Sequence, residues 1–416
     1  MPRQKLVIIG SGWSGFTLLQ KLDIKKFEVT VMSPRLTSPY TPLLASAAAG
    51  FFGFAVVEDP VRDRHRPIHF FKAHVDDIDF DRKICTCYPS FDDIPPTRFD
   101  VQYDIVIIAP GCENNTFGIP GVREHAIFVK TADDARAVRR QIVNMAEQAI
   151  LPFQTEQQRR DLLRVVIVGA GPTGAEFAAQ LSDLFNGDFP RLYPSLANKV
   201  SLSLYDVAGR VLSSFDETLA DHAVRTLSTH RVDIRTKRHI TKVEAGRLYT
   251  EEDGEVPFGM LIWATGNAQV PLVEKLKVTK RGRAQRIQTD AFLRAHGPDG
   301  NVMPDVFALG DAADIVDQEL PTTAEVACQK ADYLAAALNG SYPTGTPPFK
   351  YKQKAVVAYL GQEDGVIAGK ADWTGRRAWL AWQSKNFFWV RTPKKRIMVL
   401  MNWILNLAFG REIARL

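Results

Sequence analysis

Two short apolar runs, each followed directly by a glycine-rich turn and then by a helix-like stretch, dominate the hydrophobic pattern of the chain. The first run covers residues 6–9 and the second covers residues 165–168. Short apolar runs bounded by turn signals are typical of buried strands, and a helical stretch directly after the turn predicts a strand–turn–helix unit. The pattern therefore predicts two α/β units of similar design.

Further apolar runs extend each unit. Residues 27–32 and 103–108 are expected to be strands of the first unit, and residues 200–205 and 260–263 strands of the second. Another strand, at residues 305–309, leads into Gly310 and Asp311. Strands that alternate with helical stretches are typical of parallel, doubly wound sheets.

Both turns carry the same glycine spacing. They contain Gly10, Gly12 and Gly15, and Gly169, Gly171 and Gly174. In this spacing the glycines allow a tight turn and a close approach of the backbone to a pyrophosphate, which the N-terminus of the helix then binds. One such pattern is weak evidence, but two of them in strand–turn–helix context indicate two nucleotide cofactors. We expect an α/β fold with two Rossmann-like dinucleotide-binding domains.

The residue that follows the second strand of each unit distinguishes the two sites. In the second unit it is Asp206, and a carboxylate there favours NADH because it would repel the 2′-phosphate of NADPH. Arg210 keeps NADPH open as the less favoured alternative. Asp206 comes later than usual, and a loop-like insertion at residues 185–199 accounts for the delay. In the first unit the position holds Ser33, so a hydroxyl would have to bind the ribose.

Four side chains outside the turns are candidates for chemistry. Glu176 would face the place where the two cofactors meet, although a helix acid favoured by the helix dipole is the alternative. Asp311 could accept hydrogen bonds from the ribityl chain of a flavin or could simply cap a helix. Glu325 and Gln329, four residues apart on one predicted helix, could line a site or lie at the surface.

The composition changes toward the C-terminus. From Lys370 to Leu416 there are ten lysines and arginines against two acids, with five of the seven tryptophans. A helix that is basic on one side and apolar on the other suits a bilayer surface, and packing against the body or in a homodimer is the alternative. The side chains expected at the membrane are Trp379, Trp382, Trp389, Trp403, Arg391, Lys394, Lys395 and Arg396.

Other features narrow the class of protein. No apolar run reaches the roughly 20 residues that span a bilayer. The first strand begins near Lys5, which leaves no room for a signal peptide, so we expect an intracellular protein that is not secreted. The four cysteines form neither a metal pattern nor a disulfide framework, so no metal site is expected. The net charge of +5 is modest, and no nucleic-acid partner is expected. The last residues, Ala414, Arg415 and Leu416, loosely match a peroxisomal address.

This order of motifs resembles the two-dinucleotide-binding flavoprotein superfamily and, within it, the type II (alternative) NADH dehydrogenases. The passages that carry the resemblance are residues 33–35, 41–44, 115–122, 174–178, 263–267, 307–311, 379–382 and 409–413. The resemblance implies FAD in the first domain, NADH in the second, hydride transfer to the flavin and two-electron transfer to a quinone without proton pumping. No cysteine pair follows the first turn, so a disulfide relay is not expected.

The resemblance also implies domain bounds and further cofactor-binding residues. It assigns residues 1–125 and 269–345 to FAD binding, 126–268 to NAD(P)H binding, and 346–416 to a C-terminal amphipathic helical tail for membrane association or dimerisation. The added cofactor-binding residues are Trp13, Ser14, Pro34, Arg35, Thr41, Pro42, Leu43, Ala109, Gly111, Ala324, Pro172, Thr173, Thr265, Gly266 and Asn267. The membrane could be mitochondrial or another.

One departure leaves the electron acceptor open. The family usually has a glutamine of the quinone pocket where this chain has Glu325. A carboxylate there could donate a proton to a quinone if its pKa were raised, or it could mark a different acceptor. The alternatives are therefore a flavoenzyme for a dedicated small molecule and an NADH-binding redox scaffold that resembles apoptosis-inducing factor.

Overall fold

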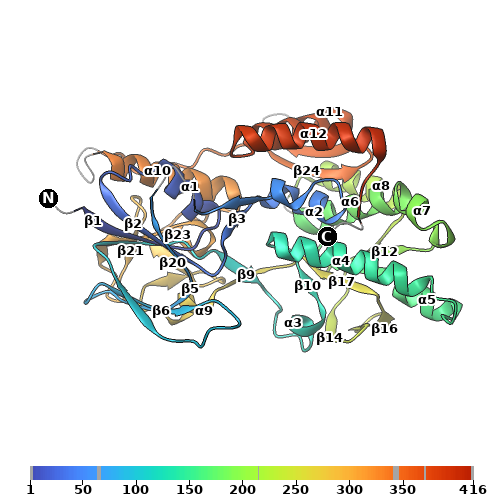
Figure 1. Ribbon diagram of the computed structural model, residues 1–416, viewed down its shortest axis with the longest axis horizontal. Helices are drawn as coiled ribbons and strands as arrows, with labels where there is room; N and C mark the ends of the chain where they lie inside the picture. The colour runs from blue at the N-terminus through green and yellow to red at the C-terminus, as the bar shows by residue number, and fades with distance from the viewer. Residues whose placement is uncertain (1–2, 63–66, 214, 341–345, 370–371, 414–416) are drawn as a thin grey trace. The chain divides into compact units, whose positions relative to one another are not determined.

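The computed structural model describes residues 3–62, 67–213, 215–340, 346–369 and 372–413 (Figure 1). The chain forms two compact units, and each unit is assembled from three segments. The first unit consists of Met1–Pro39, Asp59–Glu113 and Asn267–Gln353, and the second of Tyr40–Glu58, Asn114–Gly266 and Lys354–Leu416.

A mixed sheet with a parallel centre forms the body of the first unit. Its parallel strands are, in order, β22 (Val302–Ala308), β8 (Ile105–Ile108), β1 (Gln4–Ile9), β2 (Phe27–Ser33) and β5 (His69–Asp79). Along β1, Leu6 and Ile8 join one hydrophobic core while Val7 and Ile9 join another. Both faces of the sheet are therefore covered, which is why these strands are continuous apolar runs in the sequence.

Antiparallel strands extend this sheet on both sides, and helices cover it. The strands are β6 (Ile84–Pro89) and β7 (Phe99–Gln102) on one side, and β19 (Lys280–Arg281), β20 (Arg286–Thr289) and β21 (Arg294–His296) on the other. Strand β23 (Ala313–Ile315) pairs with β20 in parallel. Helices α1 (Trp13–Lys21) and α10 (Ala324–Asn339) pack against each other (Figure 1). This unit also contains β3 (Thr37–Pro39), β18 (Asn267–Gln269) and α9 (Pro271–Lys275). Strands β4 (Glu58–Pro60) and β9 (Cys112–Asn114) each include residues of both units.

The second unit is built on a five-stranded parallel sheet. Its strands are β10 (Ile127–Phe128), β17 (Met260–Trp263), β11 (Arg164–Val168), β12 (Ser201–Tyr205) and β13 (Val232–Arg235), in this order. Its helices are α2 (Leu44–Ala48), α3 (Val122–His125), α4 (Ala132–Ala149), α5 (Glu156–Leu162), α6 (Pro172–Asn186), α7 (Phe189–Leu192) and α8 (Glu217–Thr229). A three-stranded antiparallel sheet, β14 (Ile240–Glu244), β15 (Arg247–Thr250) and β16 (Gly254–Pro257), completes this part.

The segment at residues 185–199 is only in part the loop that the sequence predicted. Helix α6 continues to Asn186, and α7 follows almost at once. Phe185 and Phe189 are buried and their ring centroids lie 5.4 Å apart. This aromatic pair anchors the end of α6 and the short helix α7, while turns and a 3-10 helix at Pro194–Leu196 form the rest of the segment.

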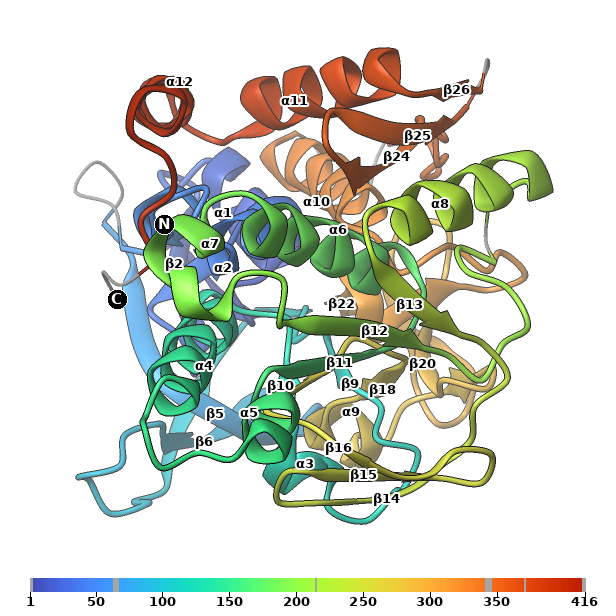
Figure 2. The same ribbon diagram turned by 90° about the vertical axis from the view of Figure 1, so that its right-hand side faces the viewer.

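The C-terminal region contains a small sheet as well as the expected helices. Strands β24 (Val356–Gly361), β25 (Asp364–Ala368) and β26 (Trp373–Thr374) are antiparallel, and α11 (Arg376–Trp389) and α12 (Pro393–Phe409) follow them. In Figure 2, α11 lies over β24 and β25, and α6 lies on their other side. Because β24 is covered on both faces, its sequence lacks the alternation that would reveal a half-buried strand.

Two side chains of the tail that were expected at the membrane are buried instead. Trp382 is 8% exposed and its ring stacks on that of Tyr359 at 5.0 Å. Lys395 is 6% exposed and its Nζ donates a hydrogen bond to the backbone carbonyl of Glu58 at 2.7 Å. Both side chains contact partners within the second unit. The prediction that they face a membrane, which used only the helical spacing of the tail, was therefore wrong for these two residues.

Within the described part of the chain, no helix combines the length and the apolar character needed to cross a membrane. The three residues of the possible peroxisomal address, Ala414, Arg415 and Leu416, lie outside the described residues.

Candidate functional site

The two helices that follow the glycine turns begin with bare N-termini. Gly12 is the N-cap of α1 and Gly171 is the N-cap of α6, so no N-cap side chain occupies the first-turn N–H groups. Helices α4, α10 and α12 are instead capped by threonine hydroxyls. The free N–H groups and the positive end of the helix dipole are what a pyrophosphate needs.

These N-cap glycines also face open space. A Cβ atom built on Gly12 or Gly171 meets no atom of the described residues within 4 Å. Both have negative φ angles, −70° and −73°, that any residue can adopt, so backbone strain does not explain the glycines. The missing Cβ leaves room for a group that approaches the backbone closely, and this fits a dinucleotide at each turn.

The other glycines of the turns serve the protein itself. Gly10 has φ +97°, and a Cβ on Gly15 would lie 2.0 Å from the carbonyl oxygen of Gly10. The second turn repeats this geometry, because Gly169 has φ +107° and a Cβ on Gly174 would lie 1.8 Å from the Gly169 oxygen. The first glycine makes the turn and the third lets the helix pack on the strand.

In both units the residue at the end of the second strand reaches the glycine turn. The carboxylate of Asp206 accepts hydrogen bonds from the backbone N–H groups of Ala170, at 2.5 Å, and Ala208, at 2.7 Å. In the first unit the hydroxyl of Ser33 lies 2.8 Å from that of Ser11. The two sites share one design with different chemistry, an anion in the second unit and a neutral hydroxyl in the first.

Most of the remaining candidates of the first unit lie around its turn. The carbonyl of Ala109 lies against Gly10, and the backbone of Gly310 approaches the Ser14 hydroxyl. Asp311 accepts a hydrogen bond from the Cys112 thiol at 3.1 Å. Trp13 and Ala324 are the first residues of α1 and α10, Pro34 and Arg35 follow β2, and Gly111 has φ +78°.

A cavity of about 210 Å³ in the second unit brings candidates from two predicted sites together. Thr41 and Pro42, which were predicted to bind the flavin, line it beside Pro172 and Thr173, which were predicted to bind NADH. Leu43 is buried next to Pro42 in the same turn. The structure does not place all candidates of the second site at this cavity: Thr265 and Gly266 follow β17, and Asn267 belongs to the first unit.

Glu176 also lines this cavity. One carboxylate oxygen accepts a hydrogen bond from the backbone N–H of Tyr359 at 3.3 Å. Burial raises the pKa of Glu176 to about 7, although hydrogen bonds from Tyr359 and Trp382 oppose the increase. A carboxyl group with such a pKa can hold or release a proton at neutral pH. A glutamate on the exposed face of a helix rarely has this property.

The sequence did not identify three residues that complete the cavity wall. Trp382, Lys385 and Asn386 line it from α11. Asn386 is 3% exposed, and its Nδ2 has no hydrogen-bond partner among the described residues. A buried, unpaired donor on the wall fits a cofactor carbonyl. Lys385 and Asn386 follow Trp382 by three and four residues, so all three side chains share one face of the helix. This spacing is the sequence signal that could have identified them.

On α10 the candidates Glu325 and Gln329 are hydrogen-bonded to each other. Nε2 of Gln329 donates to Oε1 of Glu325 at 2.8 Å and to the backbone carbonyl of Lys352 at 2.9 Å. Oε1 of Gln329 accepts from the N–H of Lys352 at 3.0 Å. Both side chains are partly buried, so the pair is oriented by the chain around it.

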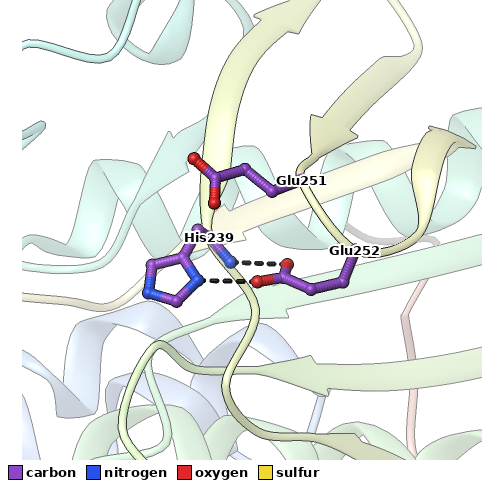
Figure 3. A group of neighbouring side chains, drawn as sticks. All are labelled: His239, Glu251 and Glu252. Atoms are coloured by element: carbon purple, nitrogen blue, oxygen red, sulfur yellow. Dashed lines mark hydrogen bonds and ion pairs between the residues drawn. The ribbon is translucent and has the colours of Figure 1, made fainter.

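The described residues contain one group of His, Cys, Asp or Glu side chains with ligand atoms close enough for a metal ion, namely His239, Glu251 and Glu252 (Figure 3). Nδ1 of His239 lies 2.6 Å from Glu252, whose other oxygen accepts from the backbone N–H of His239 at 2.9 Å. All three are exposed. Glu252 raises the pKa of His239, and the geometry is that of a surface ion pair.

Comparisons with known proteins agree with this geometry. The family model of the pyridine nucleotide-disulphide oxidoreductases matches residues 4–331. The chain is 34% identical to a probable NADH dehydrogenase of Dictyostelium discoideum, over 100% of this chain and 92% of the relative. It is 31% identical to the mitochondrial internal alternative NAD(P)H-ubiquinone oxidoreductase A1 of Solanum tuberosum, over 100% and 88%.

The fold is also that of a solved structure, NDH2 from Plasmodium falciparum in complex with NADH. The superposition has a TM-score of 0.91 at 24% sequence identity and covers 99% of this chain and 100% of the other. The expected fold class and the expected resemblance are thereby confirmed. The chain belongs to the pyridine nucleotide-disulphide oxidoreductase family and, within it, to the alternative NADH dehydrogenases.

Proposed function

We propose that the protein is an FAD-dependent NADH:quinone oxidoreductase that acts at a membrane surface without pumping protons. The observation that carries the proposal is the pair of helix N-termini without side-chain caps, each directly after a parallel strand of its own sheet, together with the cavity at Glu176. The names of the relatives, NADH dehydrogenase and NAD(P)H-ubiquinone oxidoreductase, support the same reaction.

Each of the two glycine turns would bind one of the two cofactors. The first turn, with Gly12 and Ser33, would hold the pyrophosphate and ribose of FAD, and Asp311 would accept from its ribityl hydroxyls. The second turn, with Gly171 and Asp206, would hold NADH, because the carboxylate at Asp206 disfavours the extra phosphate of NADPH. When bound, the flavin supplies the chemistry, which is hydride acceptance from NADH and delivery of two electrons to a quinone.

At the cavity, Glu176 would hold a proton on its carboxyl group near neutral pH and release it as the reaction requires. Its pKa of about 7 suits this role, since a proton-transfer group works best with a pKa near the operating pH. Asn386 would donate from Nδ2 to a carbonyl of the bound cofactor. Pro172, at the first position of α6, preorganises the helix start beside them.

On the acceptor side, Glu325 and Gln329 would contact the quinone from α10. The hydrogen bond from Gln329 holds the Glu325 carboxyl in a fixed orientation. Glu325→Gln can keep that hydrogen bond, because a Gln oxygen also accepts. Improved quinone turnover in this variant would indicate that the enzyme diverged from a quinone-reducing ancestor and that Glu325 serves a dedicated small-molecule substrate instead.

Helix α12 would attach the enzyme to a mitochondrial membrane. Leu407 and Phe409 are 91% and 84% exposed, and Ile397, Ile404 and Leu405 are exposed as well. Lys394 and Arg396 at the start of the helix are also exposed, so apolar contact and attraction to anionic lipid act together. The names of several relatives specify mitochondria. The alternative is that the same face of α12 forms a homodimer interface. Sedimentation of the protein without lipid would detect such a dimer.

Steady-state turnover tests the proposal. The purified, FAD-loaded protein is mixed with NADH or NADPH and a soluble quinone analogue, and the loss of reduced nicotinamide is followed. We expect quinone-dependent oxidation, faster with NADH. FAD-loaded protein that oxidises neither nucleotide with a quinone would contradict the function, and oxidation only with another acceptor would contradict the quinone.

A further inference from the structure

A second and larger cavity lies in the same unit as the Glu176 cavity. Its volume is about 620 Å³, and residues of α6, β24, α11 and α12 line it. Trp382 contributes to both cavities, whereas Glu176 and Thr173 line only the smaller one. The larger cavity is therefore a separate space beside the proposed nicotinamide site, and nothing in the proposed reaction uses it.

Helix α6 presents hydrogen-bond acceptors to this space. Gln180 is 4% exposed, and its Oε1 has no hydrogen-bond partner among the described residues. Asp183, three residues later on the same helix face, accepts from the Tyr359 hydroxyl and, at 3.1 Å, from the N–H of Gln362. Burial raises the pKa of Asp183. A buried acceptor without a partner favours a ligand that brings a donor.

One cation adjoins these acceptors. Nη2 of Arg411 lies 3.9 Å from the Asp183 carboxylate, and its Nε lies 3.5 Å from Asp188. Its Nη1 also donates to the backbone carbonyl of Gln180 at 3.4 Å. Arg411 is thus engaged by two carboxylates and a backbone carbonyl, which leaves Oε1 of Gln180 as the acceptor for a neutral donor.

Three tryptophans and further polar side chains line the rest of the cavity, which opens toward α12. Trp379, Trp382 and Trp403 line the cavity, and Trp403 stacks on Phe387 with ring centroids 6.0 Å apart. Flat aromatic walls suit a planar ring. Leu407 lines the cavity and is 91% exposed, so the cavity continues into the apolar face of α12 that we assign to the membrane.

We propose that this cavity binds the reduced product, an isoprenoid hydroquinone, with a ring hydroxyl donating to Oε1 of Gln180 and the tail leaving past Leu407. The inference rests on the proposed quinone reduction and adds a second, non-reacting site for its product. Neither carbonyl of the oxidised quinone can pair with Gln180 Oε1, because both groups are acceptors, whereas a hydroquinone hydroxyl can donate to it. This unpaired acceptor therefore favours the reduced form.

Equilibrium dialysis of the FAD-loaded enzyme without oxygen tests the site, with decylubiquinol and decylubiquinone as probes. We expect the wild-type enzyme to bind one equivalent of decylubiquinol about tenfold more tightly than decylubiquinone. Gln180→Leu should weaken this binding of decylubiquinol about tenfold. Gln383→Leu is the matched control, because Gln383 lines the same cavity but is partly exposed to solvent. It should change the affinity less than about twofold.

Equal binding of both redox forms by wild type would overturn the inference without reliance on any variant. Displacement of decylubiquinol by soluble phosphocholine would also overturn it, in favour of a lipid headgroup. Turnover of NADH and quinone without Gln180-dependent binding would refute this site and leave the proposed function. Gln180-dependent binding in an enzyme that does not reduce quinones would refute the proposed function and leave the site.

Discussion

The carboxylate of Asp206 accepts a hydrogen bond from the backbone N–H of Ala170 at 2.5 Å. Ala170 stands between the first two glycines of the second turn, so one side chain both fixes the turn and gives the site its charge. In the first unit the Ser33 hydroxyl makes the corresponding contact with Ser11 at 2.8 Å. This difference is the clearest chemical distinction between the two nucleotide sites.

Asp206→Asn should reduce the preference for NADH over NADPH by about tenfold, which corresponds to roughly 1.4 kcal/mol. The amide oxygen can still accept from Ala170, while the charge that repels a 2′-phosphate is lost. The values of kcat/KM for both nucleotides measure the ratio. Equal loss for NADH and NADPH would mean that Asp206 supports the turn without selecting the nucleotide.

Gly171→Ala should raise the KM for NADH at least about tenfold with little effect on stability, because the new methyl fills the space left for the pyrophosphate. Gly174→Ala is the contrasting change. Its Cβ would lie 1.8 Å from the Gly169 oxygen, so it should destabilise the protein by about 1–3 kcal/mol. Melting temperatures and NADH titrations separate the effects, and a Gly171→Ala enzyme with normal KM would place the pyrophosphate elsewhere.

Glu176→Gln should flatten the pH dependence of both turnover and stability. The folded state holds the Glu176 proton up to about pH 7, while the ordinary value is 4.5. The unfolded chain ionises first as pH rises, so wild type loses stability between pH 4.5 and 7, by at most about 3 kcal/mol. Melting temperatures at pH 5 and pH 8 should therefore differ less in the variant. An unchanged difference would mean that Glu176 is already ionised at pH 5.

Ile404→Glu with Leu407→Glu should weaken binding to anionic vesicles at least about tenfold, because two exposed apolar side chains of α12 become charged. Leu192→Glu, an exposed leucine on α7, is the matched control and should bind vesicles like wild type. Co-sedimentation measures both. Equal binding of all three proteins would move the membrane contact away from α12.

The sequence predicted what is encoded locally. The buried strands, the two glycine turns and the acid at the end of β12 follow from short patterns, and the structure has all of them. What the sequence missed depends on distant partners. Glu176 meets Tyr359 at a separation of 183 residues, and Lys395 reaches the carbonyl of Glu58 at a separation of 337. Helical periodicity cannot identify such partners, so Trp382 and Lys395 were expected to face lipid.

The most direct test of the central claim is the flavin spectrum of the purified protein during an oxygen-free titration. Added NADH should bleach the bound flavin with one equivalent per chain, and a soluble quinone added afterwards should restore the oxidised spectrum with formation of hydroquinone. Flavin that NADH does not bleach, or bleached flavin that no quinone restores, would contradict the account.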